Sequence, residues 1–303
     1  MIEPGIFAAL GAAAAWATSS TLMATQSARM DSGSISAIRL TFAAIFFMTV
    51  LFAAGQQGEI RDMGWNHGAQ LILSALLGLA VGDTLYVVAI GMVGMARAFT
   101  IALGTFTVLA YAFSIVFLGD AVTIAVIVGS VLVLTAIYLV ALRGRPKASA
   151  DDPNVVMVSP RRVFLGLAIV LIAGACWAGA AVWTRAVALD YGTLAVGSIR
   201  LPAAAFLVSM YVAINGASAV RQRQVSRRSA MLLAIAGIAG TGLGGLLYLV
   251  ALKDIGAGRA AVLASMSPLF ALPLGALILK ERITLWVAVG TVLAVCGIVL
   301  LSV

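Results

Sequence analysis

Long apolar runs separated by short polar stretches fill most of the chain. Each run holds about 20 residues with few charges, the length that a helix needs to cross the hydrocarbon core of a bilayer. The runs lie at residues 4–24, 35–55, 69–91, 98–118, 122–142, 163–184, 194–215, 230–252, 259–279 and 284–303. The pattern predicts an all-α membrane protein with ten transmembrane helices.

Composition points to the same class. Of the 303 residues, 63% are hydrophobic and 10% are charged, whereas an ordinary soluble domain has roughly 25% charged residues. This apolar composition excludes a disordered chain. A disulfide scaffold is excluded as well, because the cysteines Cys176 and Cys296 lie inside apolar runs as small core residues. The net charge of +8 lies in loops at one membrane face, so it does not indicate a nucleic-acid binder. Lipid and a small-molecule substrate are the expected partners.

Cofactor chemistry has no motif in this sequence. The chain has no Gly-x-x-x-x-Gly-Lys-Ser/Thr nucleotide loop, and its one histidine, His67, lies in a polar stretch. ATP-driven transport and histidine-ligated metal chemistry are therefore not expected, and no cofactor is predicted. An intramembrane enzyme would need a Gly-x-Ser-x-Gly or His-Glu-x-x-His signature, and neither occurs.

The sequence repeats itself at an offset of 161 or 162 positions. Glycine, tryptophan, tyrosine and charged positions coincide, which shared hydrophobicity alone does not explain. The aligned pairs include Gly5 and Gly166, Trp16 and Trp177, Arg39 and Arg200, Gly78 and Gly240, Gly82 and Gly244, and Tyr86 and Tyr248. We therefore expect a first five-helix repeat at residues 1–142, a linker at 143–162 and a second repeat at 163–303.

An odd number of helices in each repeat inverts the second copy relative to the first. Inverted repeats place a substrate site near the midplane between the halves and support alternating access. Because both halves are in one chain, a monomer is expected to be functional. The loops after the odd-numbered helices carry thirteen Lys and Arg against four on the other side, which predicts that both termini are extracytoplasmic.

Four aromatic residues related by the repeat fall at membrane depth. Trp16 and Trp177 lie near the middle of their runs, although tryptophan usually collects at membrane interfaces. Tyr86 and Tyr248 each extend a Gly-x-x-x-Gly strip, and a buried phenol needs a polar partner or water. They are candidate walls of a substrate cavity, with core packing as the alternative. The weaker candidates for the same wall are Phe106 and Tyr111.

Three charged residues lie within apolar runs, where each costs about 2.5–3.5 kcal/mol at a helix centre. Arg39 and Arg200 are repeat mates and could extend to the membrane surface. Asp83 lies deeper, and its mate is Gly245. The alternatives for Asp83 are an ion pair with Arg39, a coupling site that binds a proton or a cationic group in the pathway, and hydrogen bonds to hydroxyls such as Thr84.

Prolines interrupt two of the later runs. Pro202 lies in the seventh run, and Pro268 and Pro273 lie in the ninth. Each proline removes a backbone donor and tends to bend a helix. Such bends would serve gating or shape static packing.

Four features of the second half form a recognisable pattern, namely Tyr248–Lys253, Ser267–Phe270, the segment Leu279–Thr284, and Gly290 in the last run. With these residues the sequence resembles the EamA repeat of the drug/metabolite transporter superfamily. The resemblance covers nearly the whole chain. The first half departs from the pattern, because Phe106 stands where proline is expected and Asp83 is unusual.

The resemblance implies two inverted five-helix repeats and a secondary carrier of small metabolites. Within the superfamily the chain is similar overall to bacterial aromatic amino acid exporters, which implies a multi-pass protein of the bacterial inner membrane that exports amino acids. A multidrug or cationic-metabolite exporter is the alternative. An intramembrane enzyme and a channel are the other classes considered.

Both termini are expected on the extracytoplasmic face. A reporter that is active only outside the cytoplasm, fused after Val303, should therefore be active, and a cytoplasmic reporter at the same place should be silent. The opposite pattern would reverse the orientation, and an odd helix count would contradict the inverted repeat.

Overall fold

The computed structural model describes residues 4–118, 124–139, 159–188, 191–215, 225–255, 263–264, 266–280 and 283–301. The elements of the first repeat are α1 (Pro4–Gln26), α2 (Ser32–Ala53), α3 (Gly58–Asp62), α4 (Trp65–Ala75), η1 (Leu76–Gly82), α5 (Asp83–Val93), α6 (Met95–Leu118) and α7 (Ile124–Tyr138). Those of the second are α8 (Pro160–Ala188), α9 (Thr193–Asn215), α10 (Arg227–Ala236), η4 (Gly237–Gly244), α11 (Gly245–Ile255), α13 (Ser267–Ile278) and α14 (Leu285–Leu301).

Six helices in the described ranges are long and apolar enough to cross a membrane. Their bounds are Pro4–Gln26, Ser32–Ala53, Trp65–Val93, Pro160–Thr184, Thr193–Ile214 and Arg227–Tyr248. Four apolar helices are shorter, namely Met95–Ala110, Ile127–Ala136, Ser267–Ile278 and Leu285–Gly297. Each helix overlaps one predicted run. The length and composition of the described helices thus identify six membrane spans, and the count of ten transmembrane helices stays a prediction.

The boundary of the linker differs from the expectation. The predicted linker ends at residue 162, whereas α8 begins at Pro160. Proline fits the first turn of a helix, because the N–H that it lacks has no intrahelical acceptor there. Ser159 precedes this helix and accepts a hydrogen bond from the backbone N–H of Arg162 at 3.3 Å. Most of the linker lies outside the described residues.

The third span of each repeat contains a π-helical segment that the sequence pattern does not predict. η1 joins α4 to α5, and η4 joins α10 to α11. Leu76 and Gly237, which begin these segments, are 161 positions apart, whereas Gly82 and Gly244, which end them, are 162 apart. The one-residue slip between the repeats thus falls within the π segments, which are often found at functional sites.

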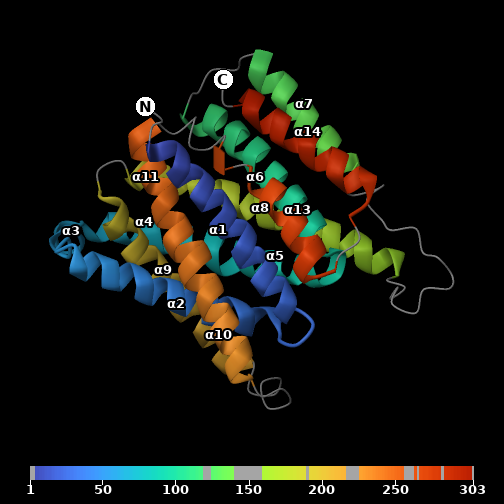
Figure 1. The fold of residues 1–303 in the computed structure, drawn as a ribbon. Coiled ribbons are helices and arrows are strands. Elements are labelled where there is room, and N and C mark those ends of the chain that lie inside the picture. Colours follow the sequence, from blue (N-terminus) through green and yellow to red (C-terminus); the bar gives the residue numbers. More distant parts are fainter. Residues whose placement is uncertain are drawn as a thin grey trace.

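The first helix of each repeat packs against helices of the other repeat. α1 packs against η4, α11 and α13 of the second repeat, and its mate α8 packs against η1, α5 and α6 of the first. Two groups result, which we call the α1 group (α1, α2, α10, η4, α11, α13) and the α8 group (α4, η1, α5, α6, α8, α9). α2 packs on α9 between the groups, and α7 lies beside α14 at one end of the molecule (Figure 1).

Glycines allow the close approach of these helices. A Cβ on Gly82 would lie 2.9 Å from the Trp177 ring, and a Cβ on its mate Gly244 would lie 2.9 Å from the Trp16 ring. Gly78 is in similarly close contact with Ala180 across the same interface. The Gly-x-x-x-Gly strips of the third and eighth predicted helices are therefore surfaces on which a helix of the opposite repeat packs.

The three prolines expected to interrupt helices lie in two kinds of position. Pro202 and Pro273 lie inside α9 and α13. Pro268, in contrast, lies in the first turn of α13, because a turn at Met266 precedes a helix that begins only at Ser267. A proline in this position starts a helix and does not bend one.

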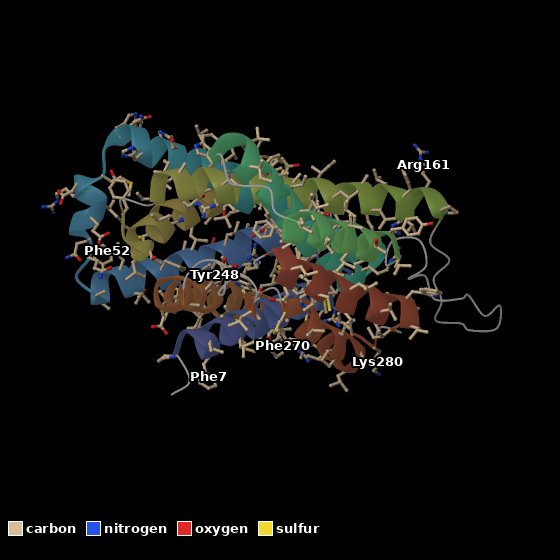
Figure 2. All side chains as sticks on the ribbon, turned by 90° about the horizontal axis from the view of Figure 1, so that it is seen from above. Phe7, Phe52, Arg161, Tyr248, Phe270 and Lys280 are labelled. Carbon is tan, nitrogen blue, oxygen red and sulfur yellow. The ribbon has the colours of Figure 1, made fainter. Side chains whose placement is uncertain are left out.

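The ends of the bundle can be located by labelled side chains. Figure 2 shows Arg161 and Lys280 at one end and Phe52 at the opposite end. Arg161 lies in the first turn of α8, and Lys280 follows α13, so basic residues from two places where positive charge is in excess lie at the same end.

Adding a methyl group at Gly174 should destabilise the packing of α8 on α6. A Cβ there would lie 2.8 Å from Thr105 Cβ and 2.9 Å from the carbonyl oxygen of Ala102. We expect Gly174→Ala to lower the free energy of unfolding by about 1–3 kcal/mol. Gly68→Ala is the matched control, because nothing lies within 4 Å of that position in helix α4. Thermal unfolding in detergent measures both, and equal stability of the two variants would contradict this packing.

Candidate functional site

Asp83 is held by groups from both repeats. It is the first residue of α5, directly after the π segment η1. Its carboxylate forms an ion pair with the Arg39 guanidinium on α2 and accepts a hydrogen bond of 2.7 Å from Trp177 Nε1 on α8. The side chains of Asp83 and Arg39 are 13% and 5% exposed. The charge therefore lies inside the bundle, with a donor for each carboxylate oxygen.

Arg39 points inward and does not extend to the membrane surface. In addition to the ion pair, its Nη1 donates a hydrogen bond to the hydroxyl of Thr241 in η4. The guanidinium thus connects α2 to α5 and to η4, which belong to different helix groups. Among the described residues Asp83 has no hydrogen bond to Thr84, whose hydroxyl is buried without a partner. Three alternatives for Asp83 are open from the sequence. The contacts of Asp83 in the structure are those of the first, an ion pair with Arg39.

The four repeat-related aromatic residues form two matching pairs. The rings of Trp16 and Tyr248 have centroids 5.3 Å apart and planes inclined by 51°. The rings of Trp177 and Tyr86 have centroids 5.1 Å apart and planes inclined by 56°. Each pair takes its tryptophan from one repeat and its tyrosine from the other. Tyr86 also packs on Phe99, at 6.2 Å between centroids.

The two pairs share the packing and differ in polarity. Trp177 donates to Asp83, whereas Trp16 donates no hydrogen bond in the part of the chain that the structure describes. This difference follows from the repeat mate of Asp83, which is Gly245. The site is thus geometrically symmetric in its rings and asymmetric in its charge.

Arg200 has a different environment from its mate Arg39. Its Nε donates to the Ser74 hydroxyl at 3.2 Å, and Thr184 donates to the same hydroxyl at 3.2 Å. Asp83 interacts electrostatically with Arg200, but no ion pair joins them within the described ranges. Two arginines and one aspartate therefore leave an excess of positive charge in this region.

Of the other two predicted cavity residues, only Phe106 has a described side chain. Phe106 is half-buried in α6 and makes no ring contact within the described part of the chain. The side chain of Tyr111 lies outside the described residues. Sequence analysis missed Thr241, Ser74 and Thr184, which contact the arginines or their partners. Hydroxyls in apolar helices usually bond their own backbone, so the sequence offers no signal that marks these three.

No metal site is evident in the described ranges. They contain no group of three or more His, Cys, Asp or Glu side chains that could hold a metal ion. The polar groups that converge are guanidinium, carboxylate, hydroxyl and indole N–H. Such groups can bind and orient a small polar molecule.

Comparison with known proteins decides the family. The pattern of the EamA-like transporter family matches residues 3–142 and 164–303. The chain belongs to the EamA-like transporter family. The two matched ranges correspond to the two repeats, and members of this family are membrane transporters of small molecules and not enzymes. A multi-pass membrane protein in a lipid environment follows from the family and from the apolar helices.

The fold of this EamA-like chain is also seen in solved structures. A crystal structure of a protein is similar over 99% of this chain and 96% of its own, with a TM-score of 0.70 and 16% sequence identity. At this identity the similarity shows the fold alone. No curated protein sequence matched the chain.

Removing the charge of Asp83 should destabilise this EamA-like transporter. In Asp83→Asn the buried Arg39 guanidinium loses its counterion, and breaking a buried pair in this way costs about 3–5 kcal/mol. Unfolding in detergent should show the loss. The double change Arg39→Gln with Asp83→Asn should recover part of it, because no buried charge is then left alone.

Asp62→Asn is the control, because Asp62 lies exposed in α3. A stability of Asp83→Asn equal to that of Asp62→Asn would mean that the ion pair contributes nothing to the fold.

Proposed function

We propose that this protein is a secondary transporter that exports amino acids, including aromatic ones, across the bacterial inner membrane by alternating access. The observation that carries the proposal is the pair of Trp–Tyr contacts, Trp16 with Tyr248 and Trp177 with Tyr86, each made between the two repeats. In an inverted-repeat transporter the substrate binds between the repeats near the midplane. The ring pairs would then line that place.

The chemistry of the ring pairs suits an amino acid. An indole and a phenol ring provide an apolar surface for a side chain and a polar tip for its charged groups. Phe106 on α6 would extend this wall, and so would Tyr111. The substrate cavity is thus proposed to be lined by six aromatic residues.

The charge of the region favours an amino acid over a cationic drug. Asp83 is already paired with Arg39, and Arg200 adds a second positive charge. A cation placed beside the ring pairs would meet net repulsion, whereas a zwitterion offers a carboxylate to the excess positive charge. The multidrug alternative lacks this support.

Alternating access would follow from an exchange of conformation between the repeats. In the first repeat α2 packs against α5, and the Arg39–Asp83 pair holds them together. The mates α9 and α11 are in less extensive contact. In the opposite state α9 would close on α11 while α2 separates from α5. The bends at Pro202 in α9 and Pro273 in α13 would allow these helices to move.

The end of the bundle that carries Arg161 and Lys280 is proposed to face the cytoplasm (Figure 2), because Lys and Arg collect in cytoplasmic loops. Both termini would then be extracytoplasmic. One chain contains both repeats, so a monomer would provide the complete pathway.

Proteoliposomes test the proposal. Purified protein should take up labelled L-phenylalanine in a saturable manner, and unlabelled L-phenylalanine inside the vesicles should accelerate uptake by counterflow. A panel of amino acids and cationic drugs, with and without an imposed pH gradient, should favour the amino acids. Uptake that depends on the gradient in the wild-type protein and not in Asp83→Asn would assign Asp83 a coupling role, and wild-type indifference to the gradient would leave exchange or facilitated diffusion.

Variants locate the site. Trp177→Phe keeps an aromatic ring but removes the N–H donated to Asp83, so it should lower the rate of uptake about tenfold with little change in the amount of protein in the membrane. Trp65→Phe is the control, because Trp65 is 86% exposed. Counterflow of cationic drugs alone would overturn the amino-acid assignment, and normal uptake by Trp177→Phe would move the site elsewhere.

A further inference from the structure

We propose that Arg200 and Trp16 form the binding site for the carboxylate of the substrate, next to Gly245. The inference rests on the proposed function and adds to it the group of the substrate that is recognised and the two donors that recognise it. It follows from comparing the two halves of the molecule position by position.

The first half provides the template. The carboxylate of Asp83 accepts from an arginine, Arg39, on one oxygen and from the indole N–H of Trp177 on the other. Arginine and indole N–H are both donors only, so together they define a carboxylate-binding pair. The carboxylate in this half is built into the chain.

The repeat-related site around Gly245 has the same two types of donor, one from each repeat, and no carboxylate of its own. The repeat mates of Arg39 and Trp177 are Arg200 and Trp16, and the mate of Asp83 is Gly245. The relation extends to the packing, because Gly82 lies against Trp177 as Gly244 lies against Trp16. A carboxylate is therefore missing from one position in an otherwise repeated arrangement.

Space for the missing group is available at Gly245. A Cβ built on this residue would have only two ring carbons of Phe47 nearby, both at 3.9 Å. That is ordinary van der Waals contact, whereas most glycines of the π segments are in much closer contact. Glycine is thus not required here for helix packing, and its effect is to leave the position after Gly244, the glycine that contacts Trp16, without a side chain.

The donors retain the capacity to bind. In the described part of the chain Arg200 makes one hydrogen bond, from Nε to Ser74, so both terminal nitrogens are without a partner. Trp16 makes a ring contact with Tyr248, and its N–H donates to no described residue. Arg200 and Trp16 are both half-buried, so these donors are neither fully hydrated nor internally satisfied. An unpaired donor at membrane depth is costly until a ligand accepts from it.

The conformational exchange would bring the two donors together. Arg39 reaches Asp83 where α2 packs on α5, and the corresponding helices α9 and α11 are less closely packed. When α9 closes on α11, Arg200 would approach Gly245, which directly follows Gly244, the residue that the Trp16 ring contacts. The substrate carboxylate then takes the place that Asp83 has in the first half, so that ligand binding and closure of the second half stabilise each other.

The test compares two probes that differ only in charge, 3-phenylpropanoate and 3-phenylpropanamide, by titration calorimetry with the full chain in detergent. The wild-type protein should bind the carboxylate at least about tenfold more tightly than the amide, because hydrogen bonds to a charged group are the stronger ones. Arg200→Gln and Trp16→Phe should each lower this ratio, and Arg200→Lys should restore part of it. Arg61→Gln, in the exposed helix α3, should leave it unchanged.

Gly245→Asp provides a second test that needs no loss of the donors. The new side chain would supply the missing carboxylate from within the chain, and affinity for 3-phenylpropanoate should fall at least about tenfold. Should Arg200→Gln fail to fold, this variant and Trp16→Phe decide the matter.

A wild-type ratio near one, the absence of 3-phenylpropanoate binding, or an undiminished ratio in the Arg200, Trp16 and Gly245 variants would overturn the assignment. Transport separates this failure from failure of the proposed function. Counterflow of L-phenylalanine without carboxylate preference would remove the site and leave the amino-acid transporter. Carboxylate preference without amino-acid transport would keep the site and remove that substrate.

Discussion

A carboxylate inside an apolar helix bundle must be surrounded by donors, and this requirement sets the arrangement around Asp83. Its two oxygens are satisfied by Arg39 and Trp177, and Arg39 in turn bonds Thr241. These four residues come from α2, α5, α8 and η4. Moving any one of these helices by more than about an ångström would leave a buried polar group unsatisfied. The charge therefore holds together elements of both repeats.

Glycine makes that arrangement sterically possible. The indole of Trp177 can reach Asp83 because Gly82, the preceding residue, has no side chain to keep the ring away. The π-helical segment that ends at Gly82 also determines the direction in which Asp83 projects from α5. The same combination of a π segment, a terminal glycine and an opposing tryptophan recurs at Gly244 and Trp16. Packing is thus conserved between the halves even where charge is not.

The difference between the halves is a single side chain with a large electrostatic consequence. Asp83 neutralises Arg39. Gly245 provides no such charge, so Arg200, the repeat mate of Arg39, has no counterion in the described part of the chain. An internal carboxylate favours one closed arrangement at all times, whereas a carboxylate delivered by a ligand favours the other only when the ligand is bound. This asymmetry gives two similar repeats different roles in one transport cycle.

The sequence by itself determined the helical class, the overlap of each described apolar helix with one apolar run, and the repeat that relates Trp16 to Trp177 and Arg39 to Arg200. Hydrophobicity and local spacing carry that information, because a bilayer requires apolar helices of a set length. Only the tertiary structure decided that Trp16 meets Tyr248 of the opposite repeat, that Arg39 turns inward, that Pro268 starts a helix, and that π segments precede Asp83 and Gly245. Each of these depends on which helices pack together. Packing, and not local sequence, determines the contacts between residues far apart in the chain. Packing also determines the hydrogen-bond register of a crowded helix.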